Sequence, residues 1–203
     1  FSWSYIDEQM AKNNWKSSKP NPYSELPQMV LMTYDIPNEI RNIAMDTNLN
    51  EFNISEFFRA EKNSRGEDEF VHKNEVQKWL DFIRGDYLLG NLKPGSGHKK
   101  PVLPFYDTIV KSNLNHTLWM LPRVASCNAM EKLLSENQNN RFSSEYEIIN
   151  ISGNNVGTGK KAKVPVENTI KNGLDTKSIT LTCGKLSQGV TVPQWGGVFM
   201  LRN

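Results

Sequence analysis

Hydrophobic and polar residues alternate most clearly near the end of the chain. Apolar residues alternate there with threonines, in the order Ile179, Thr180, Leu181, Thr182 and Cys183. A period of two predicts a β-strand over residues 178–183. Gly184 ends this run, and a second apolar run predicts another strand over residues 198–201. A strand, a polar turn and a further strand are typical of the carboxyl edge of an α/β sheet, where ligands usually bind.

The same kind of pattern continues upstream, where short apolar runs alternate with helical periodicity. Residues 116–121 and 146–151 predict strands, and residues 126–134 and 166–172 predict helices. Strands that alternate with helices favour a parallel, right-handed sheet. We therefore expect the α/β fold class over residues 116–203, with helices flanking the sheet and a mainly helical segment before it.

The first half of the chain predicts a different organisation. Residues 1–25 predict an extended and helical lead-in, with a helix over residues 7–15. Residues 26–115 combine a predicted strand at 29–36 with helices. Together with the sheet-forming part at 116–203, this gives the domain organisation that we expect.

Within the helical segment, one stretch has a clear apolar stripe. Three residues at helical spacing form it: Val76, Leu80 and Ile83. Gly85 follows at the position of a C-terminal cap. A stripe of this kind is more often core or interface than a ligand site. Residues 61–68 predict a charged loop, and residues 91–104 predict a mobile loop.

Composition changes this picture little. The 203 residues carry a net charge of +2, too small on its own to indicate nucleic-acid binding. No apolar run approaches the ~20 residues of a membrane span, and no signal-peptide pattern is visible, so we expect a cytoplasmic protein with no membrane partner. Cys127 and Cys183 lack metal-binding spacing and are expected to be reduced core thiols. The three histidines are dispersed, and we expect no metal site.

Lysines gather in two glycine-containing stretches. They are Lys93, Lys99 and Lys100 in the first and Lys160, Lys161 and Lys163 in the second. A solvated loop is one interpretation of each stretch, and a flexible loop close to DNA is the other. The second stretch, GNNVGTGKKAK, does not match a phosphate-binding loop. Such a loop requires a Ser or Thr after its Gly-Lys pair, and here Lys161 follows.

The end of the predicted strand at 178–183 carries a family resemblance. Thr182, Gly189, Thr191 and Pro193 match the pattern of motif V of superfamily 2 helicases, in the form found in helicase subunits of type III restriction enzymes. Thr191 stands where many members of that family have an Asp. The stretch HTLWMLPRVASCNAMEKLL is similar to motif IV of the same family. The resemblance implies a RecA-like second motor domain, incomplete at its C-terminus.

Five residues are candidate contacts to a nucleic-acid backbone. Arg123 and Ser126 stand at the start of a predicted helix, whose free N–H groups and positive dipole end favour a phosphate. Helix capping alone is the alternative role for both. Thr182, Lys185 and Ser187 follow the next strand on the same sheet edge, where hydroxyl and ammonium groups are suited to the same strand of nucleic acid.

The resemblance also implies a role within a larger machine, an ATP-dependent DNA helicase or translocase of a restriction-modification enzyme. It places Gly189 and Thr191 facing a nucleotide held by a first RecA-like motor domain. The implied partners are DNA and that first domain, with methylation or nuclease subunits left open, and the implied cofactors of the parent protein are ATP and Mg²⁺. The first domain's phosphate loop and acidic magnesium pair are not found here, nor is an arginine finger before Asn203. We therefore expect no catalytic residue and no ATP hydrolysis from this chain alone.

Two other classes of function stay open at this point. A non-enzymatic nucleic-acid or protein-interaction module would use the helical segment 53–84 as its contact surface and the basic loops to hold nucleic acid. A small-molecule enzyme on a doubly wound sheet would need a nucleophile paired with a base, and the sequence shows no such pair.

Overall fold

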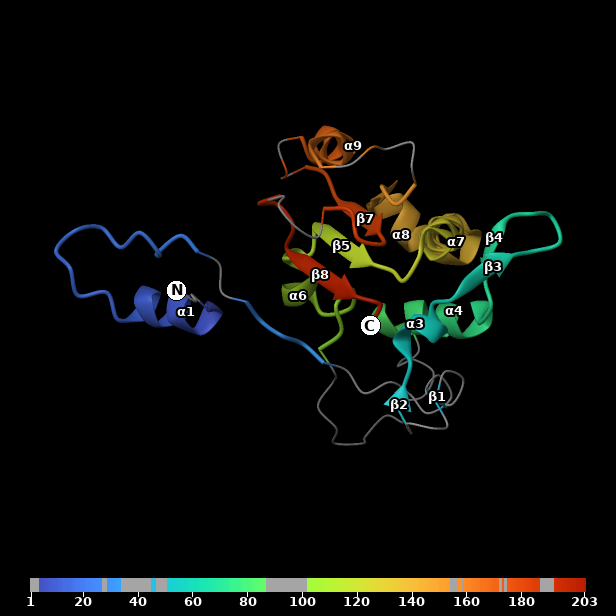
Figure 1. Cartoon of the computed structure of the whole chain (residues 1–203), viewed down its shortest axis with the longest axis horizontal. Helices are drawn as coiled ribbons and strands as arrows, with labels where there is room; N and C mark the ends of the chain where they lie inside the picture. Colours follow the sequence, from blue (N-terminus) through green and yellow to red (C-terminus); the bar gives the residue numbers. More distant parts are fainter. Residues whose placement is uncertain are drawn as a thin grey trace. The chain divides into compact units, whose positions relative to one another are not determined.

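The computed structural model describes residues 4–26, 29–33, 45–46, 51–86, 102–153, 157, 159–171, 173, 175–186 and 192–203. Contacts divide the chain into two compact units, Phe1–Ile36 and Pro37–Asn203. Figure 1 colours both units along the sequence. Among the described helices, none is both long and apolar enough to cross a membrane.

Among its described residues, the first unit forms one helix, α1 (Tyr5–Asn13). It begins at a capping box in which Ser4 and Asp7 exchange hydrogen bonds. The helix predicted over 7–15 is therefore confirmed, with its start two residues earlier. The strand predicted over 29–36 is not formed over residues 29–33, which have no neighbouring strand among the described residues. Its remaining residues lie outside the described part of the chain.

Residues 51–86 form two helices around a β-hairpin. The elements are α3 (Ile54–Phe57), β3 (Ala60–Lys62), β4 (Asp68–Phe70) and α4 (Lys73–Ile83). A shorter antiparallel pair joins β1 (Met45–Asp46) to β2 (Glu51–Phe52). The helix predicted from the stripe of Val76, Leu80 and Ile83 is confirmed as α4, and Gly85 follows it with φ +81°, as its capping position requires. The predicted loop at 61–68 is wrong at its ends, which are strands too short to show an alternating pattern.

Over the part of the chain that the structure describes, the main sheet has four parallel strands. They are β5 (His116–Met120), β6 (Glu147–Asn150), β7 (Ser178–Thr182) and β8 (Gly197–Met200). Their order across the sheet is β6-β7-β5-β8, and all three neighbouring pairs are parallel. The predicted α/β fold is confirmed, and this arrangement is compatible with a RecA-like domain. Cys183 falls just after β7 and is half-buried, so it is not the core thiol that we expected.

Helices cover both faces of this sheet (Figure 1). On one face lie α7 (Val124–Ser135) and α8 (Asn140–Glu145), and on the other lies α9 (Lys160–Ile170). Asn150 of β6 donates to Asn128 of α7, whereas its neighbour Ile149 packs with Val166 of α9. Adjacent residues of a strand point to opposite faces, so these two contacts assign the helices to their sides. A short helix, α6 (Thr108–Ser112), precedes β5, and a 3₁₀ turn, η1 (Asn137–Asn139), precedes α8.

The glycine- and lysine-rich loop predicted over 153–163 is wrong over its last residues, because α9 already begins at Lys160. Ala162, Val166 and Ile170 recur every four residues and are buried against the sheet. The helix predicted over residues 166–172 is confirmed as far as Ile170, but it begins earlier, at Lys160. Pro165 is unfavourable in a helix interior and hides the first turns from sequence analysis.

Aromatic side chains join the helical segment to the sheet. Trp119 of β5 is fully buried and makes an edge contact with Trp79 of α4, with ring centroids 5.7 Å apart. Phe105 stacks on Phe199 of β8 with centroids 5.6 Å apart. Pairs of this kind contribute about 0.5–1.5 kcal/mol each beyond their buried area. The apolar stripe of α4 therefore belongs to the same core as the sheet, as a core or interface role predicts.

Candidate nucleic-acid interface

The carboxyl ends of three adjacent strands carry one cationic residue each. Arg123 follows β5, Lys185 follows β7, and Arg202 follows β8. Because β5 lies between β7 and β8 in a parallel sheet, these three positions share one edge. Arg123 is exposed, and the other two are half-buried. The edge therefore offers positive charge where ligands of α/β sheets usually bind.

Arg123 is the N-cap residue of α7. Its backbone is extended, with φ −144°, and its side chain makes no capping hydrogen bond. The N–H groups at the start of α7 therefore have no side-chain acceptor from the N-cap residue, and they form the positive end of the helix dipole. An exposed guanidinium beside such a helix start is suited to an anionic group. The alternative role for Arg123, a side-chain cap, does not occur in this structure.

Ser126 lies in the first turn of the same helix but points inward. It is fully buried, and its hydroxyl donates to the Phe58 carbonyl oxygen at 2.6 Å. This bond ties α7 to the end of α3. The hydroxyl is thus engaged in packing and does not lie at the surface beside Arg123.

Thr182 shapes the turn that follows β7. Its hydroxyl donates to the carbonyl oxygen of Lys185 at 2.8 Å and accepts from the N–H of Gly184 at 3.1 Å. Gly184 has φ +146°, a conformation that favours glycine. The Lys185 ammonium donates to the carbonyl oxygen of Gly153, beyond the end of β6. The turn is therefore closed by Thr182 and tethered across the sheet by Lys185.

Three further predicted residues, Ser187, Gly189 and Thr191, lie outside the described part of the chain. Their roles stay predictions. Lysines 93, 99 and 100 lie outside it as well, and so do residues 91–101 of the predicted mobile loop. The end of that loop is described, and Leu103 there is fully buried.

Sequence analysis missed Arg202. Its guanidinium donates to the carbonyl oxygen of Cys183 at 2.9 Å, so the residue after β8 holds the turn after β7. A single arginine behind an apolar strand gives a weak signal. It becomes informative only when the strand order shows which loop lies close to it.

A polar network at the end of β6 was also missed. The Asn150 amide donates to Asn128 at 2.9 Å and to Glu131 at 2.8 Å, and it accepts from the Ser152 hydroxyl at 2.6 Å. Burial raises the pKa of the neighbouring Cys127 thiol to about 12. This thiol is therefore protonated near neutral pH and is not an activated nucleophile.

A hydroxyl and an imidazole, the groups of a nucleophile–base pair, lie in contact at the opposite end of the sheet. His116 Nδ1 is 2.9 Å from the Ser178 hydroxyl, and its Nε2 is 3.3 Å from the Gly173 carbonyl oxygen. Burial lowers the pKa of His116. His116 and Ser178 are 1% and 0% exposed. No substrate reaches a pair enclosed in this way, so the contact is structural.

The fold and this edge together define an α/β domain with a parallel sheet and a cationic carboxyl edge. No protein-family model matches the chain, and no solved structure matches it. The chain is similar to a Mycoplasma pneumoniae protein named "Putative type II restriction enzyme and methyltransferase", C-terminus. The two are 27% identical over 227 aligned positions, which cover 100% of this chain and 29% of that protein. The chain thus spans less than a third of its relative's length.

Proposed function

We propose that this chain is part of an ATP-dependent DNA helicase or translocase of a restriction-modification system, and forms its second motor domain. In this proposal the carboxyl edge of the sheet contacts the DNA backbone. A first motor domain in the longer polypeptide supplies the phosphate loop, and ATP with Mg²⁺ binds between the two domains. The name of the Mycoplasma relative supports the restriction-modification part of the proposal.

The observation that carries the proposal is the arrangement of β5 and β7. Their carboxyl ends are adjacent, so the uncapped start of α7 with Arg123 lies beside the turn formed by Thr182 and Lys185. Neighbouring strands are ~4.8 Å apart, a spacing that lets the two loops contact neighbouring phosphates of one strand. Contacts of this kind position a nucleic acid without reading its sequence, which is what a motor that moves along DNA needs.

Thr182 has an indirect role in this proposal. Its buried hydroxyl holds the turn after β7, which comes just before the segment that begins at Ser187. The family resemblance assigns Gly189 and Thr191 in that segment to the nucleotide side. A change at the nucleotide would then reach the sheet edge beside Arg123 through the short turn that Thr182 and Lys185 hold.

The test is DNA-stimulated ATP hydrolysis by the full-length gene product. Gly189→Val adds a branched side chain at the proposed nucleotide contact and should abolish hydrolysis. Arg123→Ala should raise the DNA concentration that gives half-maximal stimulation about fivefold. It should also reduce the slope of log K for DNA binding against log salt concentration by about 1, the value for one phosphate contact. Arg141→Ala is the matched control, because this arginine on α8 is exposed and bonds only to Asp86 among the described residues.

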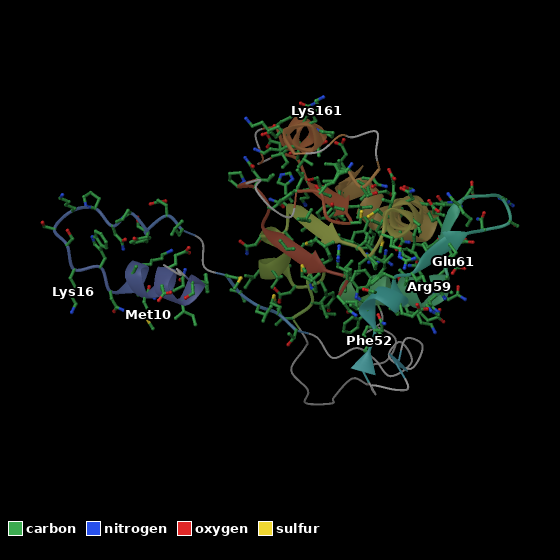
Figure 2. The ribbon with its side chains drawn as sticks, in the orientation of Figure 1. Met10, Lys16, Phe52, Arg59, Glu61 and Lys161 are labelled. Carbon is green, nitrogen blue, oxygen red and sulfur yellow. The ribbon has the colours of Figure 1, made fainter. Side chains whose placement is uncertain are left out.

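Two results would remove the motor assignment. Normal hydrolysis by the Gly189→Val protein would show that this residue does not approach the nucleotide. DNA binding by the full-length protein without any ATP hydrolysis would favour a non-enzymatic module. In that module, charge reversal at Lys160 and Lys161 should weaken DNA binding. Both lysines are exposed on α9, and Figure 2 labels Lys161.

A further inference from the structure

Large apolar side chains lie exposed in the first unit. Ile6 and Met10 of α1 are 64% and 58% exposed, and Figure 2 shows Met10 on this helix. Met29, Val30 and Leu31 follow one another and are 63%, 71% and 84% exposed. None of the described residues of this unit is buried. Fully burying a side chain of this size contributes about 1.5–3 kcal/mol, so the unit leaves much stabilisation unused.

Local hydrogen bonds nevertheless order these residues. The Tyr5 hydroxyl accepts from the Met29 N–H at 2.8 Å, which holds the extended segment beside the start of α1. The Asn21 amide donates to the Lys12 carbonyl oxygen at 2.8 Å, and the Lys12 ammonium donates to the Leu26 carbonyl oxygen. Pieces of fewer than about 40 residues rarely bury a sufficient core alone. An ordered unit with a contiguous apolar sequence and no core is typical of a docking surface.

The extended segment indicates what kind of surface covers it. Val30 and Leu31 are consecutive apolar residues, and a continuous apolar run is typical of a strand buried on both faces of a parallel sheet. Within the described part of the chain, their backbone groups make no hydrogen bond. A strand edge of another domain would satisfy those groups and cover both side chains. Helix α1 carries Asp7 and Glu8 against Lys12, so it lacks the strongly basic face that draws an amphipathic helix to an anionic membrane.

We propose that the first unit docks on the first motor domain of the longer polypeptide, with Val30 and Leu31 added as a strand to that domain's sheet. Ile6 and Met10 of α1 pack on the same domain beside the added strand. The chain spans 29% of its Mycoplasma relative, so that protein has ample length for such a domain. The inference rests on the proposed function, because it names the partner domain that the motor assignment requires.

Thiol labelling tests the docking directly. Leu31→Cys is compared in the 203-residue chain and in the full-length gene product, and Lys16→Cys is the control, because Lys16 is exposed in the polar loop of the same unit. Labelling of Leu31→Cys should be at least about tenfold slower in the full-length protein, whereas Lys16→Cys should react equally in both. Equal rates for Leu31→Cys in the two proteins would overturn the proposal. Slow labelling of Leu31→Cys in the 203-residue chain would also overturn the proposal. The protecting surface would then belong to this chain or to a second copy of it.

Photo-crosslinking identifies the covering domain. Benzoylphenylalanine replaces Thr33, an exposed residue at the end of the described segment, in the full-length protein. The crosslinked peptide should come from the domain that carries the phosphate loop, and a crosslink to residues 37–203 or to a second copy would overturn the docking. ATP hydrolysis by the unmodified protein tests the motor assignment separately. DNA-stimulated hydrolysis together with an unprotected Leu31→Cys would refute the docking and leave the proposed function standing.

Discussion

Gly196→Ala should destabilise the second unit, because two segments of backbone meet at this glycine. A Cβ at Gly196 would lie 3.0 Å from the Asn113 carbonyl carbon and closer still to its oxygen. The Gly196 N–H donates to the His116 carbonyl oxygen at 2.9 Å, which holds the chain in place just before β8. Neither contact ends in a flexible side chain, so β8 or the end of α6 must move.

The size of the effect follows from that constraint. Overpacking of a close contact costs about 1–3 kcal/mol, and the upper part of that range applies here because backbone lies on both sides. For a protein of this size, 1 kcal/mol shifts Tm by about 2–4 °C. A loss of about 2–3 kcal/mol should therefore lower Tm by about 4–12 °C. Gly197→Ala should cost less, because its Cβ would meet the end of the Leu114 side chain, which can turn away.

The assay is urea and thermal unfolding of the 203-residue chain, followed by tryptophan fluorescence. Trp119 is fully buried and reports on the sheet. The matched control is Gly153→Ala, since an added Cβ there would meet no atom within 4 Å. It should change stability by less than about 0.5 kcal/mol. If Gly196→Ala were as mild as Gly153→Ala, the close approach of β8 to the end of α6 would be refuted.

Two further predictions concern buried polar groups. Thr182→Val removes the hydroxyl that closes the turn after β7 and should lower the free energy of unfolding in urea by about 1–3 kcal/mol. Thr180→Val is the control. It should be neutral or stabilising, because the buried Thr180 hydroxyl has no partner among the described residues. Burial lowers the pKa of His116 below its ordinary 6.5, so this group's contribution to stability is complete above pH 6.5 and is lost as the pH falls through the lower folded value. Urea midpoints at about pH 7.5 and about pH 5.5 should therefore differ more for the wild type than for His116→Asn, and an equal difference would contradict the assignment.

Much of the sheet could be predicted because its strands carry their own signal. β7 alternates apolar residues with threonines, and β5 is a short apolar run that ends at a proline-containing turn. Packing overrode local signals elsewhere. Helix α9 tolerates Pro165 because its apolar face is buried. Ala162, Val166 and Ile170 form a cluster with Ile149 of β6 and with Ile151, which follows β6. The sequence predicts a helix only over residues 166–172, whereas the four-residue repeat on the buried face extends it back to Lys160.

Residue type alone does not show how the predicted site residues are used. A hydroxyl suggests a phosphate contact at Ser126 and Thr182, whereas in the structure both hydroxyls donate to carbonyl oxygens of the chain itself. A sequence shows that a hydroxyl is present, but the fold decides which way it points. Arg123 fits its predicted position better, because the start of a helix after a strand is a local feature.

Arg202 shows what sequence reasoning needs in addition to motifs. It lies 19 residues beyond Cys183, whose carbonyl oxygen accepts a hydrogen bond from its guanidinium. Cys183 follows β7 and Arg202 follows β8, and the order β7-β5-β8 places β5 between these two strands. The guanidinium crosses the end of β5 to reach the turn after β7, so the three strand ends are linked at the edge where we propose that DNA binds. A cation committed to a carbonyl oxygen acts there by holding the turn. The exposed Arg123 is therefore the residue whose loss should change DNA affinity most directly.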